Sequence, residues 1–119
     1  MQISLYHNPR CSKSRAAFAL LREAGIEPTL IDYLNNPPSL DSLTRLVGLL
    51  GVSPRALLRT GETEYQTLNL ARPDLTDAAI LAALHQHPRL LERPIAVRGD
   101  EQAVIGRPPE RVLELLDHG

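Results

Sequence analysis

Cysteine is almost absent from this chain of 119 residues, which contains a single one, Cys11. One thiol cannot form an internal disulfide, so the fold does not depend on an oxidising compartment. If Cys11 becomes oxidised in a reaction, a second thiol must come from outside the chain to reduce it again. The scarcity of cysteine therefore excludes a small secreted scaffold held together by disulfides.

Net charge, aromatic residues and long apolar runs are also scarce. The formal net charge is −1 and aromatic residues make up only 3% of the chain, so it lacks the positive field and the stacking surfaces of a nucleic-acid-binding protein. No apolar run approaches the roughly 18 residues of a membrane span, and no basic leader followed by an apolar stretch opens the sequence. We expect a cytoplasmic monomer with no nucleic-acid or membrane partner.

Lysine is represented only by Lys13, whereas arginine occurs twelve times. Arginine presents a planar fork of N–H donors that suits carboxylates and tetrahedral oxyanions, so this bias fits an anion-binding site. A GC-rich gene would produce the same excess without functional meaning. The number of arginines therefore does not establish an anion-binding site, and only the positions of individual arginines can indicate one.

The apolar pattern predicts the order of the helices and strands. Alternation over residues 2–6 and 29–33 indicates two strands, and a helical stripe over 12–24 lies between them. The remaining predicted elements are helices that begin at Ser39, Ser53-Pro54 and Thr76, a hairpin of 94–98 and 102–105 around Gly99-Asp100, and a last helix from Pro108-Pro109. On the first of these later helices we expect Leu40, Leu43, Val47 and Leu50 to face inward.

This order, βαβ followed by a helical insert and then ββα, is that of an α/β thioredoxin-like (glutaredoxin-like) fold with a mixed four-stranded sheet. We expect one domain over 1–119, with its core in 1–33 and 89–119 and the insert in 38–88. Thioredoxin-like folds hold a cis-proline opposite the active-site helix. Pro94, at the start of the third predicted strand, is the expected position.

Cys11 lies in the polar run His7-Asn8-Pro9-Arg10-Cys11-Ser12-Lys13-Ser14-Arg15, at the predicted turn from strand to helix. Free N–H groups and the dipole at a helix N-terminus lower the pKa of a cysteine and favour its reactive thiolate. The run Cys11-Ser12-Lys13-Ser14 is a C-x-x-C motif whose second cysteine is serine. The sequence thus predicts a one-thiol redox centre, with Ser14 and a donating or protonated His7 stabilising the thiolate. An inert cysteine and serines that only cap the helix are the alternatives.

Two other kinds of site do not fit the spacing. A phosphatase loop needs an arginine six positions after its cysteine, and that position holds Ala17. His85 and His87 are two residues apart, so they diverge on a helix, and only one thiol is available to complete a metal site. We expect no metal and no bound cofactor.

Four segments together resemble the arsenate reductases that couple to glutathione and glutaredoxin, and the resemblance runs almost from end to end. They are His7-Asn8-Pro9-x-Cys11-x-x-Ser14-Arg15, Arg55-Ala56-Leu57-Leu58-Arg59, the stretch from His87-Pro88 to Arg93-Pro94-Ile95, and Arg107-Pro108. The resemblance implies an oxidoreductase of the thioredoxin-like fold that reduces arsenate to arsenite.

The resemblance also implies residue roles. Cys11 would be the nucleophile and His7 its supporting neighbour, with Ser14 and Arg15 in the same loop. The oxyanion would be bound by Arg59, Arg93 and Arg107. Glutathione would be the co-substrate, and glutaredoxin would remove the glutathionyl group.

The same family contains thiol reductases of other substrates and Spx-type regulators that bind RNA polymerase. Such regulators usually carry C-x-x-C as a switch, and Ser14 removes the partner thiol here. Some arsenate reductases carry a second cysteine just before the final Arg-Pro, where this chain has Gly106. Because not every active mechanism in the family needs that thiol, we expect this departure to matter little.

Overall fold

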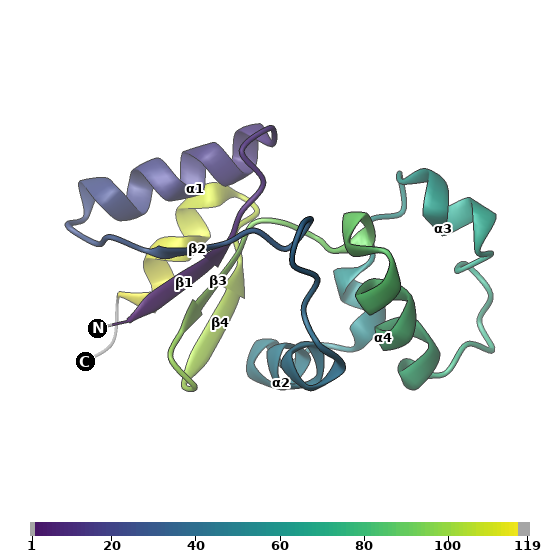
Figure 1. Ribbon diagram of the computed structural model, residues 1–119. Coiled ribbons are helices and arrows are strands. Elements are labelled where there is room, and N and C mark those ends of the chain that lie inside the picture. The colour runs from purple at the N-terminus through teal and green to yellow at the C-terminus, as the bar shows by residue number, and fades with distance from the viewer. Residues whose placement is uncertain (1, 117–119) are drawn as a thin grey trace. The chain divides into compact units, whose positions relative to one another are not determined.

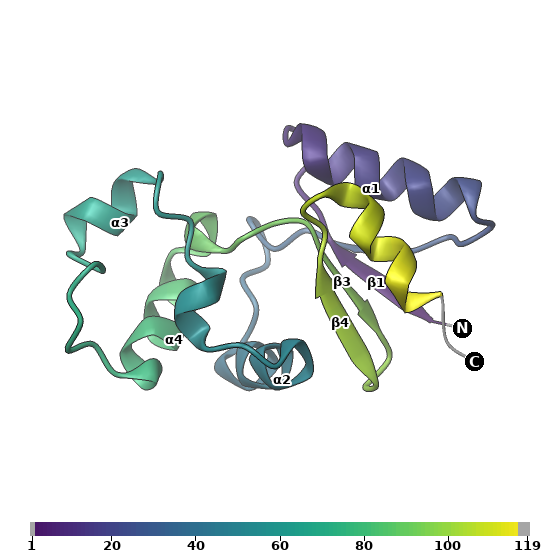
Figure 2. The same ribbon diagram turned by 180° about the vertical axis from the view of Figure 1, so that it is seen from behind.

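A computed structural model describes residues 2–116 of the chain. The chain forms two compact units, of which one comprises Met1–Asn36 together with Arg93–Gly119 and the other comprises Pro37–Glu92. Figures 1 and 2 show the elements of each unit from opposite sides. That the whole chain is one domain with an insert over 38–88 stays a prediction.

The first unit is built on a four-stranded mixed sheet with the order β2-β1-β3-β4 (Figure 1). Its strands are β1 (Ile3–Tyr6), β2 (Thr29–Ile31), β3 (Ile95–Arg98) and β4 (Gln102–Ile105). β1 and β2 are parallel, whereas β1 with β3 and β3 with β4 are antiparallel. The predicted α/β class and the mixed four-stranded sheet are confirmed, with β2 two residues shorter than expected.

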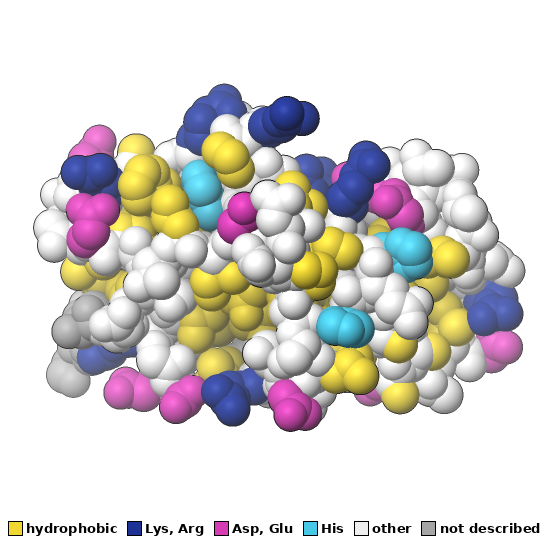
Figure 3. All heavy atoms as spheres, viewed as in Figure 1, with side chains coloured by type: hydrophobic (Ala, Val, Ile, Leu, Met, Phe, Trp, Pro, Cys, Tyr) yellow, Lys and Arg dark blue, Asp and Glu magenta, His cyan; other side chains and the backbone are white. Residues whose placement is uncertain are grey.

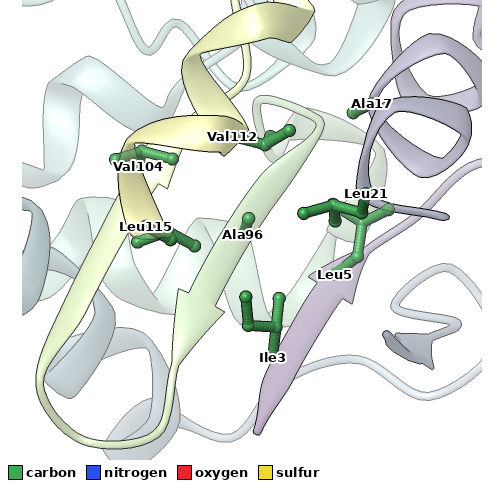
Figure 4. Close-up of a cluster of buried hydrophobic side chains, with 8 residues drawn as sticks. All are labelled: Ile3, Leu5, Ala17, Leu21, Ala96, Val104, Val112 and Leu115. Atoms are coloured by element: carbon green, nitrogen blue, oxygen red, sulfur yellow. The ribbon is translucent and has the colours of Figure 1, made fainter. Parts of the chain in front are cut away.

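Helix α1 (Ser12–Glu23) and the 3₁₀ helix η3 (Pro109–Leu115) cover one face of this sheet (Figure 2). Strand side chains alternate between faces, and because Leu5 pairs with Ala96 both residues point toward these helices. The buried core between sheet and helices, drawn in Figure 4, consists of Ile3, Leu5, Ala17, Leu21, Ala96, Val104, Val112 and Leu115. This core fixes α1 against β1 and thereby the turn that carries Cys11.

The second unit is helical. Its elements are α2 (Leu40–Leu50), η1 (Pro54–Leu57), α3 (Thr63–Thr67), α4 (Asp77–Gln86) and η2 (Pro88–Leu90). The side chains of Ser39 and Thr76 accept hydrogen bonds from the backbone N–H groups three residues on and so cap α2 and α4, as predicted. The five-residue helix α3 was not foreseen in the sequence pattern.

Two details of the predicted helices are wrong. Leu40 is 47% exposed, and Leu46 joins Leu43 on the buried face instead, because the inward stripe of α2 begins one turn later than the apolar pattern suggests. The last helix is a 3₁₀ helix rather than an α-helix. Residues three apart are aligned in a 3₁₀ helix, so Val112 and Leu115 are buried while Leu116 lies at the edge.

Candidate active site

Cys11 occupies the N-cap position of α1, immediately before the first helical residue. Its backbone N–H donates to the carbonyl oxygen of Asn8 at 2.9 Å, and the backbone N–H of Arg10 donates to Asn8 Oδ1 at 3.0 Å. Asn8 itself is buried. These bonds close the β1–α1 loop on itself and hold the sulfur at the open end of the helix.

The surroundings of the Cys11 thiol act on its pKa in both directions. Burial, the largest single effect, raises the pKa, whereas the backbone N–H groups of Ser14 and Lys13, the Ser14 hydroxyl and the Arg93 side chain lower it. The lowering effects together outweigh burial, so the pKa of Cys11 lies below its ordinary value. Ser14 is fully buried and its hydroxyl makes no hydrogen bond of ordinary geometry with the described residues. The geometry therefore does not by itself show a hydrogen bond from this hydroxyl to the sulfur, and its stabilising role stays a prediction.

Two arginines from the far end of the sequence lie beside the thiol. Arg107 Nη2 is 4.0 Å from Cys11 Sγ, and Arg107 Nε donates to the carbonyl oxygen of Arg93 at 2.8 Å. Arg93 precedes β3 and Arg107 follows β4, so the antiparallel pairing of Ile95 with Ile105 brings the two together. The peptide bonds Arg93–Pro94 and Arg107–Pro108 are both cis.

Close packing explains why position 106 holds a glycine, and this reason was not visible in the sequence. Its backbone N–H donates to the carbonyl oxygen of Pro94 at 2.8 Å, and a Cβ at this position would lie 2.8 Å from Pro94 Cγ and 3.0 Å from Val112 Cγ1. Only hydrogen fits there unless the proline ring moves. The glycine next to Arg107 thus keeps the two arginine-bearing segments in close contact. The expectation that the missing cysteine at this position matters little stays a prediction.

His7 is half-buried at the end of β1. Burial and, to a smaller extent, the positive charge of Arg15 lower the pKa of His7 below its usual value, which favours the neutral imidazole near pH 7. The ring packs against Phe18 with centroids 5.7 Å apart, and Nδ1 is buried without a hydrogen bond to any described residue. Of the two states that the sequence left open, this environment favours a neutral, donating imidazole over a cation; support of the thiolate by His7 stays a prediction.

Arg15 and Arg59 have partners other than the sulfur. Arg15 is exposed, and its Nη1 donates to the carbonyl oxygen of Pro9 at 2.9 Å, which ties the first turn of α1 to the loop. Arg59 belongs to the second unit, where its Nη1 donates to Glu92 Oε1 at 3.1 Å. Roles for Arg15 in catalysis and for Arg59 in oxyanion binding stay predictions.

The loop and the first turn of α1 form a basic surface. Arg10, Lys13 and Arg15 are exposed, the first 22 residues contain no Asp or Glu, and Figure 3 shows basic side chains over this end of the helix. Unbalanced positive charge raises the local concentration of anions. The surroundings of Cys11 therefore favour an anionic substrate.

Neither a metal nor a membrane site stands out in the structure. Residues 2–116 contain no group of three or more His, Cys, Asp or Glu side chains placed to hold a metal ion. Among these same residues, no helix combines the length and apolar character needed to cross a membrane.

Comparison with known proteins places this site in a family. Residues 6–115 match the ArsC family, and the chain belongs to it. The chain is 47% identical over 116 residues, 97% of both sequences, to the Escherichia coli K12 protein named uncharacterized protein YfgD. It is 44% identical to the arsenate reductase of Haemophilus influenzae, covering 98% of this chain and 100% of that protein. The arsenate reductase structure from Vibrio cholerae superposes with a TM-score of 0.92 at 50% identity, covering 96% and 97% of the two chains.

The lowered pKa of Cys11 leads to a prediction about pH. Alkylation by iodoacetamide follows the thiolate fraction, so the rate should be constant at alkaline pH and fall as the pH drops through the lowered pKa, with a midpoint below that of an unperturbed cysteine. In Ser14→Ala one lowering contact is lost, and we expect the midpoint to move upward. Ser12→Ala, an exposed position in the same turn, is the matched control. A wild-type midpoint no lower than that of a cysteine in a short unstructured peptide, measured in parallel, would contradict the assignment.

Proposed function

We propose that this protein is an arsenate reductase that works with glutathione and glutaredoxin. The observation that carries the proposal is the thiol of Cys11 at the N-terminus of α1, with a lowered pKa and with Arg107 Nη2 4.0 Å from its sulfur. Similarity over almost the whole chain to proteins named arsenate reductase supports arsenate as the substrate.

The arrangement solves an electrostatic problem. Arsenate is an anion near neutral pH, and the attacking thiolate is also an anion, so the two repel each other unless fixed cations lie between them. Arg93 and Arg107 supply guanidinium groups next to the sulfur, and arginine binds tetrahedral oxyanions through paired N–H donors. These donors also stabilise the charge that develops on the arsenate oxygens in the transition state. In the proposal Arg59 provides the third guanidinium.

In the proposed reaction, Cys11 Sγ attacks arsenic, forms an S–As bond and displaces an arsenate oxygen as water after protonation. Reduction of arsenic from the +5 to the +3 state takes two electrons, which two thiols supply by forming one disulfide. The chain contains only Cys11. Glutathione then attacks arsenic, forms a second S–As bond and displaces another oxygen as water. A glutaredoxin thiol attacks the glutathionyl sulfur to form a glutathione–glutaredoxin disulfide, and the electron pair of the broken S–As bond reduces arsenic to the +3 state. Water finally displaces Cys11 from arsenic, so that arsenite leaves and the Cys11 thiol is restored.

Dependence on external thiols also suggests where the protein works. A cycle that consumes reduced glutathione needs a reducing compartment, and the cytoplasm provides one. We therefore propose a cytoplasmic enzyme whose turnover is limited by the supply of its reductants.

A coupled assay tests the proposed function. Arsenate-dependent oxidation of glutathione should be negligible with either reductant alone and should proceed when glutathione and glutaredoxin are supplied together. Omitting arsenate is the control for background oxidation. Arsenite formation without any added thiol would overturn the external-thiol scheme, and no arsenite with both reductants would overturn the activity itself.

A further inference from the structure

Arg59 and Glu92 form a partly buried ion pair in the second unit. Arg59 Nη1 donates to Glu92 Oε1 at 3.1 Å, and the two side chains are 26% and 23% exposed. Fully exposed ion pairs are screened by solvent and salt and contribute little. This pair is partly shielded from both, so its electrostatic attraction holds the guanidinium against the carboxylate.

The backbone around this pair is fixed by a short antiparallel pairing. The backbone N–H of Arg59 donates to Leu90 O at 2.8 Å, that of Glu92 donates to Leu57 O at 2.7 Å, and Leu58 and Leu91 form a β-bridge between them. In this register Arg59 is opposite Leu90, so Glu92 is its diagonal neighbour on the same face, within reach of a long side chain. The pairing of the two segments therefore places the carboxylate beside the guanidinium.

Buried leucines hold both segments in this register. Leu57 and Leu90 are 0% exposed, Leu58 is 6% exposed and Leu91 is 1% exposed. Leu57 and Leu58 are adjacent and therefore face opposite sides of the pairing, as do Leu90 and Leu91, and all four are buried. The two segments are therefore held by apolar packing on both sides. Both partners of the ion pair lie outside the helices of this unit, but the backbone that carries them is fixed by the packing of these leucines.

We propose that Glu92 is a positioning residue for Arg59. Its carboxylate engages one end of the guanidinium and fixes the side-chain rotamer, which leaves the other N–H donors oriented for an oxyanion. The inference rests on the proposed function, in which Arg59 contacts arsenate. An arginine side chain that is already ordered loses less rotational freedom when it binds its ligand.

The test compares arsenate binding and turnover in Glu92→Ala and Glu92→Gln with the wild type. Protection of Cys11 from iodoacetamide by added arsenate reports binding without requiring turnover, and the coupled assay gives KM and kcat. We expect Glu92→Ala to weaken protection and raise KM about tenfold, at the lower end of the range for losing a carboxylate that orients a metal ligand. Because the chemistry at the sulfur is untouched, kcat should change much less. Glu92→Gln keeps a hydrogen-bond acceptor, so its loss of arsenate protection and its rise in KM should be smaller than those of Glu92→Ala.

A double-mutant cycle separates positioning from a general effect on folding. In an Arg59→Ala background the Glu92→Ala substitution should have no further effect on KM, since the side chain that it positions is gone. Glu64→Gln is the matched control, because Glu64 is similarly buried in the same unit and pairs with a different arginine, Arg89.

Four outcomes would overturn the inference. Equal effects of Glu92→Ala with and without Arg59 would show an indirect structural role, and a lower KM would show that Glu92 masks Arg59 rather than positions it. If arsenate protects Cys11 equally well in Glu92→Ala and in the wild type, the inference is wrong but the proposed function still stands. A wild type that arsenate does not protect and that forms no arsenite would overturn the proposed function together with it.

Discussion

Replacing Cys11 by serine should abolish arsenate reduction. A serine hydroxyl at this position does not ionise near neutral pH and is a far weaker nucleophile than a thiolate, so the S–As bond on which the proposed cycle depends cannot form. The chain has no second thiol to replace it. We expect the rate in the coupled assay to fall by at least about a thousandfold, as is usual for the loss of a catalytic nucleophile.

The structure offers a control for this experiment. Cys11 is half-exposed at a helix start and its side chain makes no capping hydrogen bond, so the Cys11→Ser variant should fold normally by circular dichroism. Ser12→Ala, the next residue along the loop, should retain activity. Arsenite production by Cys11→Ser at the wild-type rate would show that the nucleophile has been assigned wrongly.

Replacing Arg107 by alanine should have the second-largest effect. The substitution removes the guanidinium whose Nη2 is 4.0 Å from the sulfur and also breaks the bond from Nε to the Arg93 carbonyl oxygen. Loss of one preorganised donor to a developing oxyanion costs about 2.7 to 4 kcal/mol, or ~10² to 10³ in kcat. We expect a fall in this range in the coupled assay.

Arg111→Ala is the matched control for Arg107→Ala. Arg111 is exposed on η3, where it pairs with Glu114 at 3.3 Å, so its removal deletes an arginine of the same unit without touching the thiol. Its activity should equal that of the wild type. Equal losses in the two variants would mean that net charge alone, and not the position of Arg107, determines the rate.

Much of the fold followed from local patterns in the sequence. Alternation at Ile3 and Leu5 and the stripe through Ala17 and Leu21 report directly on which side chains face the core, and the polar run before Ser12 marks where the strand ends. These signals depend on neighbours within one turn or one strand, which is why the βαβ start and the place of Cys11 were predicted.

Features that depend on distant segments were not visible in the sequence. Gly106 has no special backbone angle, and its importance comes from the ring of Pro94, twelve positions earlier. Glu92 was not singled out in the sequence, because only the pairing of two leucine-rich segments places it against Arg59. The only signals for these two residues in the sequence were their positions, with Gly106 directly before Arg107-Pro108 and Glu92 directly before Arg93-Pro94.

The tight packing at Gly106 has a consequence for the chemistry open to this scaffold. A sulfur-bearing side chain at that position would begin with a carbon 2.8 Å from the ring of Pro94. An internal thiol to resolve an oxidised Cys11 could therefore enter there only if the proline gave way and disturbed its neighbour Arg93. In the proposed cycle, steric crowding at Gly106 and the single cysteine thus both leave the supply of electrons to external thiols.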